Sequence, residues 1–193
     1  MLVFTRGFHR LYRRTVGEDD VLGTLNNLRL WAIDMDVVIL LGSKTDLPIS
    51  QKCTAILQEF GVEHQVRVAS AHRSPAFVEE IVKAALADGV SVFIAMAGLA
   101  AALPGAVAAM TTKPVIGVPC GGKVPLDSLL SIAQLPPGVP AATVGVDRGE
   151  NAGYLAVQIL ALSNPKLAAA LTQNKLDQIA RVKQMDRDIN GGE

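Results

Sequence analysis

The chain has 193 residues, of which 50% are hydrophobic, 19% are charged and 4% are aromatic, and its 18 basic residues balance its 18 acidic residues. This apolar composition excludes an extensively disordered chain, and the length fits one domain with a core that needs no disulfide or metal staple. Because the net charge is zero, we expect no electrostatic binding to nucleic acid or to acidic membranes. The few aromatic rings argue against a surface that stacks on bases. Because the composition is so apolar, we expect the chain to bury part of its surface against other subunits.

The thiols and imidazoles are scattered along the chain. Cys53 and Cys120 form no CxxC motif, which argues against a disulfide framework or a zinc site and fits a reducing, cytoplasmic compartment. Three dispersed histidines do not make a metal cluster, so we expect no metal. Residues 89–112 lack charge over a length that could cross a bilayer, but Pro104 and Gly105 interrupt a mainly Ala and Gly segment. We therefore expect a strand, a loop and a helix there, and no membrane span.

The first 34 residues differ from the rest of the chain. Residues 1–16 carry four arginines and no acidic residue, and three acidic residues follow at positions 18–20. This start loosely resembles a targeting peptide, but it lacks the continuous apolar run of a secretory signal. We interpret residues 1–34 as an N-terminal extension, either an appended helix or sequence translated from an early start codon, with Met35 as an alternative start. The main domain is expected to span residues 35–193.

From residue 36 onward, short apolar runs alternate with segments of helical periodicity. The expected strands are 37–41, 64–68, 91–95, 114–118 and 142–146, and the expected helices lie within 45–61, 74–89, 103–110, 127–134, 149–162 and 165–187. Such alternation predicts a flavodoxin-like α/β fold, a three-layer sandwich whose parallel sheet has the strand order 2-1-3-4-5, with a C-terminal helix. Ligands of such sheets bind beyond the carboxyl ends of the strands, at the switch point between strands one and three.

The loop after the first strand, residues 42–46, reads Gly-Ser-Lys-Thr-Asp. Gly42 lets the backbone approach a ligand closely, Ser43 offers a hydroxyl, and the start of the helix offers N–H groups for an anion. The loop matches neither a Walker motif nor a GxGxxG fingerprint. An ordinary turn, with Thr45 or Asp46 as the helix cap, explains it equally well.

The loop after the second strand, residues 70–75, reads Ser-Ala-His-Arg-Ser-Pro. An arginine binds phosphate bidentately, and a histidine carries protons near neutral pH, so Arg73 and His72 could form a phosphate grip beside a proton carrier. The alternative is a structural histidine. We interpret His64, inside the second strand, and His9, in the extension, as non-catalytic.

The loop after the third strand, residues 97–105, is made of small and apolar residues. Small side chains let a flat ring approach the backbone, although a tight strand-to-helix crossing needs them as well.

Together these loops resemble the PurE family, and specifically its class I N5-carboxyaminoimidazole ribonucleotide mutases of purine biosynthesis. The matching stretches are GSKTD at 42–46, SAHRSP at 70–75, AGLAAALPG at 97–105, KPVIGVP at 113–119 and SIAQLPPGVP at 131–140. They occur in the family's order over about residues 36–162, and residues 1–34 have no counterpart.

The resemblance implies an isomerase that works without metal or cofactor as a homo-octamer, and that moves a carboxylate from the exocyclic amine of the ribonucleotide to carbon 4 of its imidazole. Carried over by motif, His72 transfers the proton, Asp46 binds the ribose, and Ser43 and Arg73 bind the 5′-phosphate with Ser70 nearby. The implied substrate-binding set is Ser43, Asp46, Ser70, Ala71, Arg73, Gly98, Ala102 and Leu103. The resemblance further implies that residues 134–140 reach the site of a neighbouring subunit.

The third loop departs from the family pattern. Class I members usually read AGGAAHLPG, whereas this chain has Leu99 at the second glycine and Ala102 at the histidine. One alternative is therefore a relative that binds a nucleotide with altered or little activity. A second is a direct aminoimidazole ribonucleotide carboxylase, whose class usually has a lysine at position 73 and an AGRSN loop. Two further alternatives are less favoured. The carboxylase domain that acts on nicotinate adenine dinucleotide resembles this fold but lacks the SAHR motif. A flavin-binding module would have aromatic residues that sandwich the flavin, and this sequence shows none.

Overall fold

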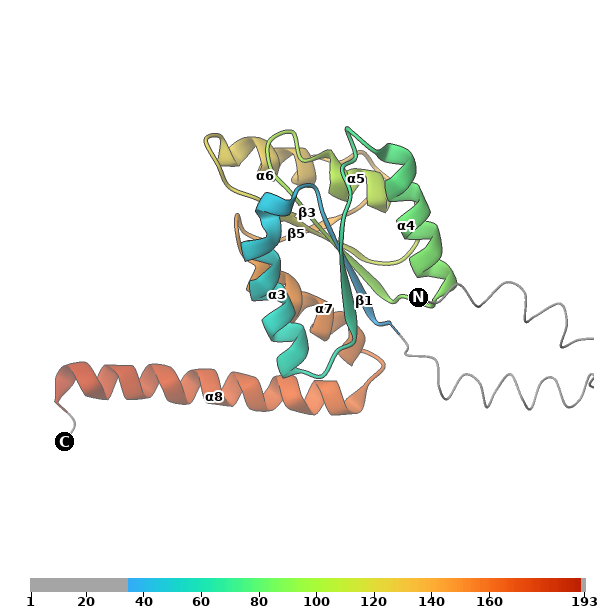
Figure 1. The fold of residues 1–193 in the computed structure, drawn as a ribbon. Helices are drawn as coiled ribbons and strands as arrows, with labels where there is room; N and C mark the ends of the chain where they lie inside the picture. Colours follow the sequence, from blue (N-terminus) through green and yellow to red (C-terminus); the bar gives the residue numbers. More distant parts are fainter. Residues whose placement is uncertain (1–34, 192–193) are drawn as a thin grey trace, which may run out of the picture. The chain divides into compact units, whose positions relative to one another are not determined.

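The structure is a computed structural model that describes residues 35–191. The interpretation of residues 1–34 as an extension lies outside the described residues. Five parallel strands form one sheet in the order β2-β1-β3-β4-β5, which confirms the predicted topology (Figure 1). The strands are β1 (Val37–Leu41), β2 (His64–Val68), β3 (Val92–Ala97), β4 (Val115–Pro119) and β5 (Ala142–Thr143).

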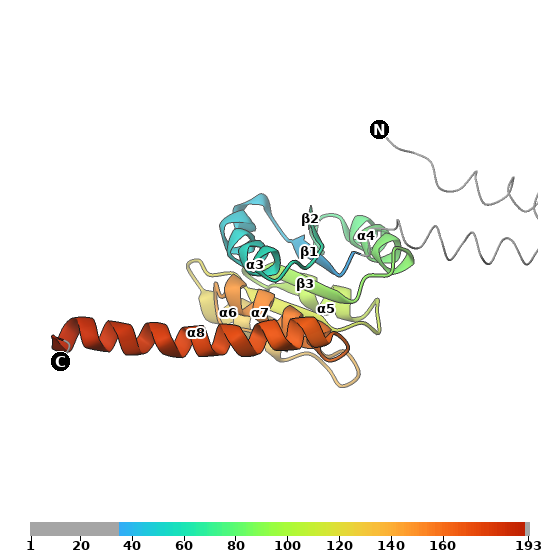
Figure 2. The ribbon, with the colours of Figure 1, turned by 90° about the horizontal axis from the view of Figure 1, so that it is seen from below.

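Helices cover both faces of the sheet (Figure 2). The first face carries α4 (Pro75–Ala87), α5 (Ala102–Ala108) and α6 (Pro125–Ala133), and the second carries α3 (Leu47–Glu59) and α7 (Gly149–Ala161). The last helix, α8 (Pro165–Asn190), packs its first turns on the second face through Leu167 and Leu171. The three predicted layers are therefore confirmed.

Alternation along the strands divides the core into two clusters. In β1, Val38 and Leu40 face the α4 side, whereas Val37, Ile39 and Leu41 face the α3 side. Successive side chains of a strand point to opposite faces, so a strand buried on both faces must be a continuous apolar run. β1, β3 and β4 are such runs, while β2 is partly exposed at the edge of the sheet.

Close contact between α3 and α7 depends on glycine. A Cβ atom on Gly153 would lie 2.9 Å from the carbonyl oxygen of Cys53, a distance that real Cβ atoms essentially never show. The absence of a side chain at Gly153 thus lets the backbones approach each other. This contact fixes α3, whose first turn follows the first candidate site loop.

Two predicted boundaries differ in detail from the structure. Asp46, one of the two expected caps, stands at the N-cap position of α3 but makes no side-chain capping hydrogen bond there, and Ser43 caps a short 3-10 turn, Lys44–Asp46, ahead of α3. The fifth strand ends at Thr143 instead of 146, although the chain stays beside β4: the Val144 N–H donates to the Gly117 carbonyl (3.2 Å). The ladder is no longer regular there, because the chain turns toward α7.

The uncharged segment at 89–112 folds as β3, a loop and α5, as the sequence indicated. Within residues 35–191, every helix is too short or too polar to span a membrane.

Candidate active site

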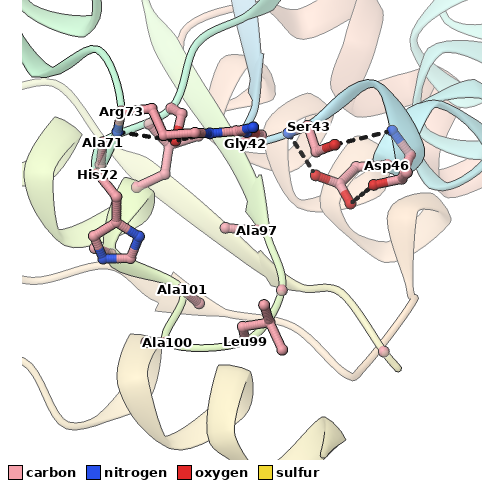
Figure 3. A pocket seen from close by; sticks show the side chains of 16 residues that line it. Gly42, Ser43, Asp46, Ala71, His72, Arg73, Ala97, Leu99, Ala100 and Ala101 are labelled. Carbon is pink, nitrogen blue, oxygen red and sulfur yellow. Dashed lines mark hydrogen bonds between the residues drawn. The ribbon is translucent and has the colours of Figure 1, made fainter. Parts of the chain in front are cut away.

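Three loops meet at the carboxyl ends of β1, β2 and β3 and enclose a pocket of about 590 Å³ (Figure 3). This is the switch point at which parallel sheets of this kind bind ligands. All nine residues that the sequence singled out line this one pocket: Ser43, Asp46, Ser70, Ala71, His72, Arg73, Gly98, Ala102 and Leu103. The structure brings them together, and the role of each stays a prediction.

The first loop holds the Asp46 carboxylate firmly in place. The Ser43 backbone N–H donates to Asp46 Oδ2 (3.0 Å), while Ser43 Oγ accepts the Thr45 N–H (3.3 Å). This reciprocal pair is a capping box, the arrangement that satisfies two N–H groups at a helix start. Asp46 is buried, with 7% of its surface exposed. Its carboxylate is therefore oriented before any ligand arrives.

Opposing effects act on the proton affinity of Asp46. Burial raises the pKa of its carboxyl above the ordinary value, and the negative charge of Asp147 adds to that rise. Hydrogen bonds from the Ser43 N–H and the Thr45 hydroxyl, together with the neighbouring Cys120 thiol, lower the pKa, but burial prevails. Hydrogen bonds donated by a ligand would stabilise the charged form of this buried carboxylate.

The second loop places Arg73 across the mouth of the first. Arg73 Nε donates to Ser70 Oγ (3.2 Å), and Arg73 Nη2 donates to the Gly42 carbonyl (3.0 Å). The loop itself is tightened by Ser74, whose backbone N–H donates to the Ser70 carbonyl (2.8 Å). Arg73 is exposed to solvent at this position, and its remaining N–H groups can meet a phosphate.

His72 points in a different direction from Arg73. Figure 3 shows its imidazole directed toward the third loop, near Ala101, whereas the Arg73 side chain runs toward Gly42. His72 is exposed at the pocket. The phosphate-binding candidate and the proton-transfer candidate are thus neighbours in the chain that serve different parts of the pocket.

The third loop supplies an apolar wall without an ionisable side chain. Leu99 adopts a left-handed backbone conformation, with φ of 52°, and 72% of its surface is exposed. A bulky residue in this region is strained, whereas glycine is not. Ala102 begins α5 and presents only a methyl group to the pocket.

The fourth part of the pocket wall was missed from the sequence. Gly121, in the junction between β4 and α6, lines the pocket, and its N–H donates to Asp147 Oδ1 (2.7 Å). The small residues Gly121 and Gly122 after β4 were a usable signal, because they follow the carboxyl end of a central strand. Asp147 gave no local signal, since its role depends on a contact across 26 residues.

The other reactive groups do not form a second centre. Within residues 35–191, no group of three or more His, Cys, Asp or Glu side chains is arranged to hold a metal ion. Cys53 is buried, and burial raises the pKa of its thiol to about 12. Burial, together with the charges of Asp46 and Asp147, also raises the pKa of the Cys120 thiol. Neither thiol is activated as a nucleophile.

Comparison with known proteins places the pocket in context. The AIR carboxylase family model matches residues 36–181. The N5-carboxyaminoimidazole ribonucleotide mutase of Methanocaldococcus jannaschii is 54% identical over 154 residues, covering 79% of this chain and 96% of that protein. A chloroplastic phosphoribosylaminoimidazole carboxylase of Vigna aconitifolia is 45% identical over 141 residues, covering 72% of this chain and 25% of that protein.

The solved structures agree with the sequence comparison. A single-residue variant of the PurE2 protein of Treponema denticola superposes with a TM-score of 0.73 at 25% identity, covering 79% of this chain and 96% of that chain. The PurE structure from the same organism superposes with a TM-score of 0.72 at 26% identity, with the same coverage of both chains. The family match covers the whole sheet and all three loops of the pocket, and the chain belongs to the AIR carboxylase family.

Proposed function

We propose that this protein is an N5-carboxyaminoimidazole ribonucleotide mutase, an isomerase of purine biosynthesis that makes 4-carboxy-5-aminoimidazole ribonucleotide. The observation that carries the proposal is the convergence of His72, Arg73, Ser43 and Asp46 on one pocket at the switch point. The relative from Methanocaldococcus jannaschii, which bears this activity in its name, matches over almost its entire length. A direct carboxylase is the second candidate, because the plant relative is named for that reaction.

The charges of the pocket give the substrate one orientation. The phosphate binds at the Arg73 guanidinium and the Ser43 hydroxyl, since these are the cationic and hydrogen-bonding groups at the carboxyl end of β1. The buried Asp46 carboxylate repels an anion and accepts hydrogen bonds from the ribose hydroxyls instead. The imidazole then lies between His72 and the third loop.

His72 carries the proton in both half-reactions. It donates a proton to the carbamate nitrogen as the nitrogen–carboxyl bond breaks, which leaves carbon dioxide and the neutral aminoimidazole. The π electrons between ring carbons 4 and 5 then form a bond from carbon 4 to carbon dioxide. His72 removes the proton from carbon 4, which restores the ring double bond and returns the proton to its carrier. Holding both fragments in one pocket replaces a bimolecular recombination by a local one.

The third loop leaves room for the reacting groups and excludes water from them. Ala97 and Ala101 are buried, and the loop offers backbone and methyl groups without a charged side chain. Such a wall excludes competing water from the carbon dioxide. Ala102 provides no hydrogen bond to the moving carboxylate, so we expect slower turnover than a histidine at this position would give.

We further propose that the protein acts in the cytoplasm as a homo-oligomer, an octamer by family resemblance. Supporting this, α6 and the residue before it leave large apolar side chains exposed: Val124 is 56%, Leu126 is 64% and Leu130 is 53% exposed. Residues 134–140 follow directly after this surface, and contiguous exposed apolar groups typically mark an interface. Light scattering of the purified protein measures the assembly.

The deciding experiment follows ultraviolet absorbance after the protein is added to carboxyaminoimidazole ribonucleotide in bicarbonate-free buffer. The mutase produces the carbon-4 carboxylate without added bicarbonate. Product formed only from aminoimidazole ribonucleotide and bicarbonate would assign the direct carboxylase instead. Binding of the ribonucleotide with neither reaction would show a binding protein and overturn the proposed activity.

A further inference from the structure

Asp147 lies outside the pocket but holds part of its wall. The residue follows β5 and precedes α7, and its N–H donates to the Pro119 carbonyl at the end of β4 (2.9 Å). Its own carboxylate accepts the Gly121 N–H (2.7 Å). Asp147 therefore binds the chain on both sides of Cys120, and this junction turns directly into the pocket at Gly121.

The backbone at both partners is shaped for this contact. Asp147 has a φ of 57°, in the left-handed region, which Asp tolerates better than bulkier residues. A Cβ atom on Gly121 would collide with Asp147 Oδ2, so only glycine permits so close an approach. The hydrogen bond thus depends on two unusual features: the left-handed backbone of Asp147 and the absence of a side chain at Gly121.

The anchored junction reaches the pocket through Cys120. Its N–H donates to the Ala97 carbonyl (2.8 Å), its carbonyl accepts the Ser128 hydroxyl (3.0 Å), and its thiol donates to the Val118 carbonyl (3.8 Å). A shift of the junction would therefore move both Gly121 and Ala97, which line the pocket together with Asp46. The charge of Asp147 also acts on the Asp46 carboxyl, because it adds to the rise of its pKa.

We propose that Asp147 is a positioning residue for the ribose end of the pocket: by holding the Gly121 N–H it fixes the β4–α6 junction, and with it Gly121 and Ala97 in the pocket wall that they share with Asp46. The inference rests on the proposed function in one respect, that the ligand carries a ribose phosphate. Asp147 acts on the ligand only through the junction at Cys120 and Gly121 and does not contact it.

The test compares ribose 5-phosphate with inorganic phosphate as probes, by calorimetry on the full chain. Asp147→Gly keeps the left-handed backbone and removes the acceptor, and it should weaken ribose 5-phosphate binding by about tenfold, the effect of one hydrogen bond. Inorganic phosphate binding should not change, because Arg73 and Ser43 remain. Asp147→Asn keeps an oxygen acceptor and a residue suited to the left-handed region, so it should restore ribose 5-phosphate affinity.

A matched control separates positioning from stability. Asn164 also anchors backbone with its side chain, accepting from the Lys166 and Leu167 N–H groups at the start of α8, far from the pocket. Asn164→Gly should lower the melting temperature and leave both affinities unchanged. If Asp147→Gly behaves like Asn164→Gly, the residue is merely structural and the inference is overturned. If Asp147→Gly does not fold, Gly121→Ala serves in its place, because its added methyl group would displace the Asp147 carboxylate. It must then show the same selective loss of ribose 5-phosphate affinity.

Turnover distinguishes this inference from the proposed function. In an active enzyme, Asp147→Gly should raise KM for the ribonucleotide about tenfold and leave kcat near the wild-type value, because binding changes and the His72 chemistry does not. If Asp147→Gly selectively weakens ribose 5-phosphate binding but the wild type shows no turnover, the mutase function is overturned and the role of Asp147 is supported. If the wild type is active and Asp147→Gly leaves its turnover unchanged, the mutase function is supported and the role of Asp147 is overturned. A wild type that neither binds nor reacts would overturn both.

Discussion

The two sides of the pocket are built on opposite principles. On the polar side, Arg73 donates hydrogen bonds to the Ser70 hydroxyl and the Gly42 carbonyl, and the Asp46 carboxylate accepts the Ser43 N–H. On the apolar side, from Ala97 to Leu103, the wall is made of small groups with one strained and exposed residue, Leu99. In the proposed function, the polar side binds and orients the ligand, and the apolar side surrounds the part of the ligand that reacts. Substitutions on the two sides should therefore have different kinetic signatures.

The largest effect is expected at His72, which stands between the two sides. His72→Asn keeps the approximate size but cannot carry a proton, so turnover should fall by at least ~10²-fold while ribonucleotide binding largely persists. Stopped assays with calorimetry on the same preparation measure both. Turnover within about tenfold of the wild type, a barrier change of only ~1.4 kcal/mol, would remove His72 from the reaction.

Arg73 tests the polar side alone. Arg73→Ala removes a charge-assisted phosphate contact, so affinity for the ribonucleotide should fall by about 10- to 100-fold, or ~1.5–3 kcal/mol. Affinity for the matching nucleoside, which lacks the phosphate, should stay the same. Equal losses for nucleotide and nucleoside would show that Arg73 supports the Gly42 loop and does not meet the phosphate.

Ala102 tests the apolar side. Ala102→His introduces a polar group beside the proposed position of the moving carboxylate, so kcat should rise by about tenfold, a fraction of the effect that one such group usually has on the rate. Ala102→Leu adds bulk without polarity and serves as the control. A clash of the new imidazole with Leu99 would show as lost nucleotide binding, and the double variant with Leu99→Gly would then recover it.

Asp46 links function to stability on the polar side. Its folded-state pKa is raised, so the folded protein holds the proton more tightly than the unfolded chain, and stability falls as pH rises through that range. Asp46→Asn removes the buried charge and should raise the melting temperature at pH 7 while weakening ribonucleotide binding. The gain should shrink near pH ~4, the ordinary range of the carboxyl, where Asp46 is increasingly protonated in both states. An equal gain at both pH values would contradict the assignment.

Leu99 carries the smallest effect. Leu99→Gly relieves the left-handed strain but adds freedom to the unfolded chain, so the two effects should nearly cancel and stability should stay equal or rise by less than ~1 kcal/mol. The neighbouring Ala100→Gly, at an ordinary φ, should instead lose about 0.5–1 kcal/mol. Chemical denaturation measures both, and an equal loss in the two variants would mean that Leu99 is not strained.

Local sequence predicted the parts of the molecule that local chemistry determines. Continuous apolar runs identified β1, β3 and β4, because strands buried on both faces need them, and Ser43, His72 and Arg73 were found because they follow strand ends. The contribution of Gly121 and Asp147 was not found. It depends on one hydrogen bond between residues 26 positions apart, which no periodicity or motif encodes. The shorter β5 was missed for a related reason, since its end is set by the turn that places Asp147.

The hydrogen bond from Arg73 to Gly42 has a consequence for local unfolding. β2 is an edge strand and pairs only with β1, yet it is followed by the loop that carries Arg73, the proposed phosphate ligand. Opening of β2 would separate Arg73 from Gly42 while β1, β3 and β4 stayed paired, and regions with fewer buried contacts open more easily in native proteins. A phosphate bound as proposed would therefore hold this edge strand in place. Ligand should slow amide exchange in His64–Val68 more than in the central strands, because binding stabilises only the closed form.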